Sequence, residues 1–319
     1  MFRKFALALA CLLICPGARA DAIHLSHYGE VMPTVPWAIA LAQHLFQKNG
    51  VNVTDVISSQ GGGTTIRNML AGGLGFGEVS AGATVSGITA GLPVKIIGVG
   101  VDSADDNTWV VPRQSPYRSF RDLRGRNLGI TGRGGVTYVY AELLLKKNGM
   151  TLHDVNGVPV GTGAGIAALD AGKLDATYEY EPLFSRDESK YRVIANIGDV
   201  FPRIATLFLV ATQDMIDRHP DQLRAIMLTH KQAVDFILAH PKEAADLARP
   251  YMVGADQAVL ERAVARMVGF RFWSEGGFNN AALANLVEVL NLTGEAKGKV
   301  DFKAMTDNRF LPPGAAPLQ

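Results

Sequence analysis

The chain has 319 residues, with 31 basic and 30 acidic side chains, a formal net charge of +1 and only two cysteines. This balance excludes the basic surface of a nucleic-acid-binding protein and a polybasic membrane anchor. The length is enough for one large domain or for two domains.

The first twenty residues are predicted to be a secretory signal peptide. Arg3 and Lys4 form a basic start, residues 5–15 are an apolar run, and residues 18–20 read Ala-Arg-Ala, a small-x-small cleavage site. The apolar run is too short to span a membrane. The alternative is a lipoprotein anchored through Cys15, which the bulky Ile14 before it disfavours.

Cleavage at that site changes the cysteine content and the charge of the chain. Both cysteines, Cys11 and Cys15, lie in the leader, so the mature chain has none. Loss of Arg3, Lys4 and Arg19 takes the 31 basic residues to 28, against 30 acidic ones. We therefore expect a soluble periplasmic protein without disulfides, thiol catalysis or thiolate metal sites.

Residues 23–101 alternate strand-like and helix-like segments. Helices begin at Pro36 and at Thr64 or Thr65, and the predicted strands are 23–28, 51–57, 74–79 and 93–101. Such β-α units imply a parallel sheet with right-handed crossovers, in which ligands bind beyond the carboxyl ends of the strands. Those ends are Tyr28, residues 58–63 and residues 80–84.

A second α/β set follows an extended segment near residues 105–112. Its predicted strands are 128–130, 155–160 and 175–180, its helices 136–148 and 166–174, and further helices follow at 221–239, 241–249 and 256–268. A strand at 203–211 leads out of this set. We predict two α/β lobes that close on a ligand, lobe 1 comprising residues 21–107 and 206–319 and lobe 2 residues 108–205.

Residues 132–135, Gly-Arg-Gly-Gly, join a strand to a helix and form a predicted anion site. Thr137 and the guanidinium of Arg133 are placed to assist. One alternative is a tight turn with Arg133 in water. A dinucleotide fingerprint is another, since Asp154 lies about twenty residues on, but its third glycine position is Thr137.

Several short motifs follow one another over residues 23–250. They are LFQKNGV at 45–51, MLAGGLGFG at 69–77, AGLPVK at 90–95, DLRGRNLGI at 122–130, and LDAGKLDA at 169–176 followed by Glu181-Pro182. In order and spacing they resemble the substrate-binding component of ABC importers of the nitrate, sulfonate and taurine group, related to exported pyrimidine-precursor binders. The resemblance implies a type II periplasmic-binding-protein fold and delivery of a ligand to a permease. The chain departs from the family at Tyr180, where relatives usually have tryptophan, and at Arg133.

Candidate ligand-binding residues come from the strand ends, the glycine-rich turn and the resemblance. Trp37 and Tyr138 are candidates to sandwich an aromatic or apolar ligand, with core packing as the alternative for Trp37. The full set is Tyr28, Trp37, Gly61, Gly62, Thr64, Ser80, Gly82, Thr131, Arg133, Gly134, Gly135, Thr137, Tyr138, Thr162, Tyr180 and Glu181.

Catalytic and metal patterns are weak. His24 and His27 would point to opposite faces of a strand, and the glycines around Ser80 do not match a nucleophile elbow. We predict no catalytic residue, no metal site and no cofactor.

We therefore expect a monomeric periplasmic solute-binding protein that works with an ABC permease at the inner membrane. Its predicted ligand is a small anionic organic solute, sulfonate- or taurine-like or an aromatic carboxylate, captured by closure of the lobes. The alternatives are an exported or moonlighting enzyme acting on a pyrimidine or sulfonate, or a sensory binding protein for a membrane receptor.

Overall fold

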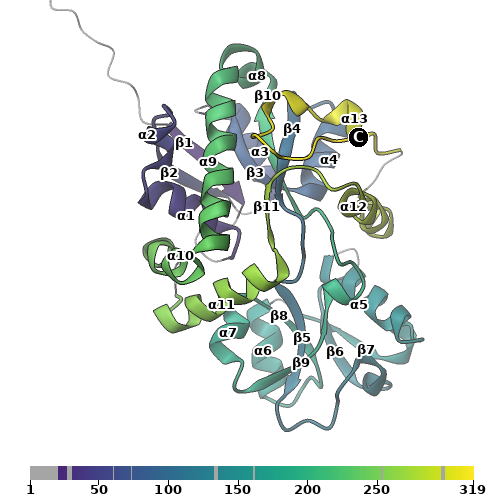
Figure 1. Ribbon diagram of the computed structural model, residues 1–319. Helices are drawn as coiled ribbons and strands as arrows, with labels where there is room; N and C mark the ends of the chain where they lie inside the picture. Colours follow the sequence, from purple (N-terminus) through teal and green to yellow (C-terminus); the bar gives the residue numbers. More distant parts are fainter. Residues whose placement is uncertain are drawn as a thin grey trace, which may run out of the picture.

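The computed structural model describes residues 21–26, 31–59, 61–72, 74–132, 136–160, 162–252, 254–295 and 299–319. Figure 1 shows two lobes, one above the other, joined by extended segments. Within the described ranges, no helix combines the length and the apolar character needed to cross a membrane.

The upper lobe is built on a six-stranded sheet with the order β11-β4-β10-β3-β1-β2. Its strands are β1 (Asp21–Ser26), β2 (Val53–Ser59), β3 (Phe76–Ser80), β4 (Val94–Val101), β10 (Leu207–Thr212) and β11 (Trp273–Gly276). β1 is parallel to β2 and β3, as predicted, but β10 is antiparallel to both β3 and β4. The sheet is therefore mixed, because the chain returns from the lower lobe at the carboxyl edge of β3 and β4 and must run back between them.

Helices cover both faces of this sheet (Figure 1). They are α1 (Thr34–Ala42), α2 (Leu45–Lys48), α3 (Gly62–Ala71), α4 (Ala81–Thr89), α8 (Gln213–Arg218), α9 (Pro220–Ala239), α10 (Pro241–Ala248), α11 (Gln257–Phe270), α12 (Asn280–Thr293) and α13 (Phe302–Met305). The helix predicted at 36–50 is divided into α1 and α2, because His44 between them has a left-handed backbone with φ 55°. Its apolar stripe is nevertheless buried at Trp37, Ile39 and Phe46.

The lower lobe has smaller sheets. β5 (Asn107–Pro112) lies between β8 (Thr177–Tyr180) and β9 (Tyr191–Asn196), antiparallel to both, while β6 (Asn127–Ile130) and β7 (Asn156–Pro159) form a parallel pair. Its helices are α5 (Val136–Lys147), α6 (Thr162–Asp170) and α7 (Leu183–Asp187). Short 3-10 helices occur at Phe120–Leu123, Leu152–Asp154, Ile197–Asp199, Arg249–Tyr251 and Asn308–Phe310.

The two lobes are also joined by side chains. One hydrophobic cluster continues from β3 and β4 through Trp109 and α5 to α12. A second link connects α11, which packs in the core of the upper lobe, to the β8–α7 region of the lower lobe. There the Arg266 guanidinium lies 2.9 Å from the Glu181 carboxylate and 2.8 Å from that of Glu188.

Candidate functional site

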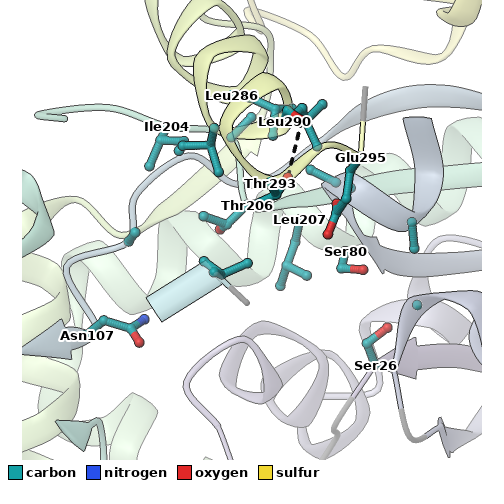
Figure 2. Close-up of a pocket in the computed structure, with 18 of the residues that line it drawn as sticks. Ser26, Ser80, Asn107, Ile204, Thr206, Leu207, Leu286, Leu290, Thr293 and Glu295 are labelled. Carbon is teal, nitrogen blue, oxygen red and sulfur yellow. Dashed lines mark hydrogen bonds between the residues drawn. The ribbon is translucent and has the colours of Figure 1, made fainter. Parts of the chain in front are cut away.

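A cavity of about 490 Å³ lies where the lobes meet the two segments that connect them. The upper lobe contributes the ends of β1 and β3, the first turns of α3 and α4, and α12. The lower lobe contributes the start of α5, and the connecting segments contribute Ala104, Asp106, Asn107 and residues 204–207 (Figure 2). This is the position beyond the carboxyl ends of strands where α/β proteins bind ligands.

Small residues bring two helix starts together on the upper wall. β2 leads through Gly61 into α3, and β3 ends at Ser80, directly before α4. A Cβ at Gly62 would lie only 2.6 Å from the Cβ of Ala83, so glycine permits α3 and α4 to approach. Ser26 and Thr65 share a 2.8 Å hydrogen bond that holds the end of β1 beside α3.

Most of the remaining wall is apolar. Leu286, Val289 and Leu290 lie at helical spacing along α12, and Ile204 and Leu207 face the cavity from the return segment (Figure 2). The Thr293 hydroxyl donates to the Leu290 carbonyl at 3.2 Å, so its proton already forms a hydrogen bond within α12. Such a lining suits a ligand with an apolar body.

The charged groups on the described wall are acidic. Asp106 and Glu295 line the cavity, whereas no lysine, arginine or histidine does so among the described residues. Burial raises the pKa of Asp106 to about 7, and the 2.8 Å hydrogen bond from the Asn107 amide opposes that rise. The Glu295 carboxylate abuts the Cα of Gly82, where a larger side chain would collide with it.

Tyr140 brings a hydroxyl to the lower wall. It lies one turn after Val136 on the same face of α5, and both residues line the cavity. Tyr140 is 3% exposed, and its hydroxyl forms no hydrogen bond within the described part of the chain. Burial, reinforced by the nearby Asp106 carboxylate, raises the pKa of Tyr140.

Four of the residues proposed from the sequence line this cavity: Gly61, Gly62, Ser80 and Gly82. Tyr28, Arg133, Gly134 and Gly135 lie outside the described residues, as does the side chain of Thr162 at the start of α6.

The other proposed residues lie elsewhere. Trp37 is fully buried in the core of the upper lobe, and Glu181 is buried beside Arg266. The Thr137 hydroxyl donates to that of Thr131 at 2.8 Å, and the Thr131 hydroxyl accepts from the Tyr138 N–H at 3.2 Å, so the pair closes the turn before α5. Tyr138 itself packs against the continuous hydrophobic cluster. The Thr64 hydroxyl accepts from Arg67, and Tyr180 lines a separate hollow that also includes Gly254 and Val259.

The site predicted from the sequence did not include Asp106, Tyr140 or the stripe on α12. A signal for Asp106 was present, because Asp105-Asp106-Asn107 is a polar run between two apolar strands in a connecting segment. Tyr140 could have been found from its position four residues after Val136. In the described ranges no group of three or more histidine, cysteine, aspartate or glutamate side chains could hold a metal ion.

Comparison with known proteins relates this arrangement to a family and a fold. A family model described as NMT1/THI5 like matches residues 34–244. A Brucella abortus protein whose name proposes a binding role is 24% identical over 262 residues, covering 80% of this chain and 80% of the relative.

Solved structures show the same fold. The periplasmic aliphatic sulphonate-binding protein SsuA from Escherichia coli superposes with a TM-score of 0.74 at 16% identity, over 90% of this chain and 92% of that one. The desulfurization enzyme DszB matches with a TM-score of 0.69 at 15% identity, over 91% and 97% of the two chains. The predicted two-lobe type II fold is thus confirmed, and the same fold also occurs in an enzyme.

Proposed function

The chain belongs to the NMT1/THI5-like family, and from this membership and the interlobe cavity we propose that it is the periplasmic solute-binding component of an ABC importer. The membership agrees with the resemblance inferred from the ordered motifs. The observation that carries the proposal is that both lobes and both connecting segments line one cavity. Closure about those segments would bury a solute and replace its hydration shell with protein groups.

The proposed solute is a small organic molecule with an apolar body and an anionic group, such as a sulfonate or an aromatic carboxylate. The apolar wall formed by α12 and the return segment supports the apolar body. The start of the twelve-residue helix α5 supports an anionic group, because its first residue, Val136, lines the cavity. Backbone N–H groups and the helix dipole favour negative charge there.

A thermal-shift screen tests the binding role. The mature chain would be heated with taurine, alkyl and aryl sulfonates, nitrate, aromatic carboxylates and pyrimidines. A solute present at about 100 times its Kd should stabilise the protein by about 2.7 kcal/mol. Calorimetry should then show one solute bound per chain, and small-angle scattering should show a more compact protein.

The matched control is Val136→Trp. Val136 is 45% exposed at the cavity wall, so a tryptophan there should fill the cavity with little effect on the unliganded melting temperature. Loss of binding in this variant supports the cleft as the site. If every solute in the screen leaves the melting temperature unchanged, the proposed function is wrong.

An enzyme acting on a sulfonate or pyrimidine is the second candidate, because DszB shares the fold. Mass spectrometry of any bound solute after prolonged incubation separates the two. Recovery of the intact solute supports a binding protein, whereas a product formed by the parent and not by Val136→Trp supports an enzyme.

A further inference from the structure

Polar groups in the cavity are of two kinds. The hydroxyl groups of Ser26, Thr206 and Thr293 already form hydrogen bonds with Thr65, with the Ser103 carbonyl and with the Leu290 carbonyl. By contrast, the Tyr140 hydroxyl has no hydrogen-bond partner in the described chain, although the residue is only 3% exposed. A hydroxyl on a residue that lines a cavity, with no partner from the protein, is one that a ligand can satisfy.

The carboxylates of Asp105 and Asp106 differ in their hydrogen bonds, and that of Asp105 has a structural role. The carboxylate of Asp105 accepts hydrogen bonds from the Ser103 hydroxyl at 2.8 Å and from the Gly198 N–H at 3.0 Å. That of Asp106 accepts from the side-chain amide of the next residue, Asn107, at 2.8 Å and from its own backbone N–H. Asp106 is half-buried and lines the cavity. Because an ionised carboxylate has about four acceptor positions, it retains acceptor capacity for a ligand there.

We propose that Asp106 and Tyr140 form a donor-selecting subsite, in which the Asp106 carboxylate accepts a hydrogen bond from an amino or ammonium group of the ligand. The inference rests on the proposed solute-binding function and narrows its substrate class. Val136 and Tyr140 lie one turn apart on α5. One small molecule can therefore place an anionic group near the start of the helix and an N–H donor near Asp106. The expected ligand class is an amino-bearing organic acid.

The surroundings of Asp106 make this preference dependent on pH. Asp105 and Glu181 are the acidic groups near it, Tyr140 faces it from α5, and burial is the main cause that raises its pKa to about 7. Protonation replaces an anionic acceptor with a neutral acid, and an ammonium ligand opposes that protonation. Affinity for an ammonium ligand should therefore rise with pH through about 7.

Three ligands of matched shape test the subsite: 4-(aminomethyl)benzoate, 4-(hydroxymethyl)benzoate and 4-ethylbenzoate. They share the carboxylate and differ only in an ammonium, hydroxyl or methyl group at the other end. Calorimetry at about pH 8.5 should rank them in that order, with about tenfold or more between ammonium and methyl, the effect of a charge-assisted hydrogen bond. At about pH 5.5 that difference should shrink.

Asp106→Asn should reduce the affinity for the ammonium ligand by about tenfold and leave 4-ethylbenzoate within about twofold. Glu295→Gln is the control, since it neutralises the other carboxylate on the wall and should spare the ranking. Tyr140→Phe should weaken the ammonium and hydroxyl ligands and spare the methyl one. Thermal melting would verify that each variant is folded.

Equal affinities for the three ligands, or equal effects of Asp106→Asn and Glu295→Gln, would overturn the subsite and leave the solute-binding function intact. The subsite is also rejected if none of the three binds a protein that binds other solutes in the screen. Absence of binding to every solute would instead reject the proposed function itself.

Discussion

A buried hydrogen bond in the upper lobe shows how a single residue can satisfy a polar group in the core. The Trp37 indole donates to the Glu78 carboxylate at 3.0 Å, and its ring packs against Phe46 and Phe76. Burial raises the pKa of Glu78 to about 8, and the bond from Trp37 opposes the rise. Trp37 thus satisfies a core carboxyl group and does not reach the cavity.

Glu78 should make folding dependent on pH. The unfolded carboxyl group ionises near its ordinary pKa of 4.5, whereas the folded one stays protonated up to about 8. Stability contributed by the protonated form is therefore complete below about pH 4.5 and is lost as the pH rises to about 8. Glu78→Gln keeps an acceptor for Trp37 and removes this loss, so the variant should gain roughly 2–4 kcal/mol on the parent at pH 8.

Urea unfolding of both proteins across this range measures the effect. The two free energies of unfolding should converge toward acid pH and separate toward pH 8. Parallel curves would show that Glu78 is already ionised in the folded protein.

At the scale of elements, the contact between α3 and α4 depends on one glycine. Gly62→Ala would place a Cβ 2.6 Å from the Cβ of Ala83 and should destabilise the protein by about 1–3 kcal/mol, the cost of overpacking. Gly63→Ala is the matched control. Its nearest neighbour would be the Arg67 side chain at 3.7 Å, so alanine should be neutral or stabilise the helix by about 0.5–1 kcal/mol. Denaturant unfolding compares the two, and equal effects would show that the contact does not limit packing.

Sequence periodicity predicted the helices and strands of this fold better than it predicted which strands pair with one another. The strands of the first β-α units and the stripe of α1 follow from local alternation and spacing. The central place of β10 does not, because pairing between residues 207–212 and two distant strands leaves no local pattern. The same distinction applies to the cavity.

Gly61, Gly62, Ser80 and Gly82 could be selected from the sequence because the ends of parallel strands gather at one edge. Asp106 and Tyr140 line the same cavity only because the lower lobe folds back on the connecting segment. The α12 stripe likewise reaches the cavity from the far end of the chain. Such juxtapositions depend on tertiary structure, which spacing along the chain does not encode.

At the scale of the whole molecule, the ion pairs between α11 and the lower lobe hold the two lobes in their relative position. Glu181 is fully buried, and the Arg266 guanidinium also stacks 4.7 Å from the centre of the Phe184 ring. Burial raises the pKa of Glu181, while Ser185 and Arg266 oppose the rise. The stability of this link therefore depends on the cation beside the carboxylate.

Arg266→Leu should destabilise the protein by about 2–4 kcal/mol, because it leaves a buried carboxylate unpaired. The double variant Arg266→Leu/Glu181→Gln should recover most of that loss. Arg262→Leu removes a more exposed pair with Glu188 and a hydrogen bond to the Ser185 carbonyl, and it should cost less than Arg266→Leu. Chemical unfolding of the three variants checks the order, and no recovery in the double variant would show that Arg266 acts through packing alone.

The position of β10 has a consequence for the order of assembly. β3 and β4 precede the whole lower lobe in the chain, yet both pair with β10, which follows it. During synthesis from the amino terminus, the edges of β3 and β4 that pair with β10 stay open until residue 212 has emerged, and the other edge of β4 waits for β11. The strands of the lower lobe, by contrast, form one uninterrupted stretch. The lobe that begins the chain is therefore the last to be completed, and its nascent edges need protection for as long as the ribosome takes to reach β10.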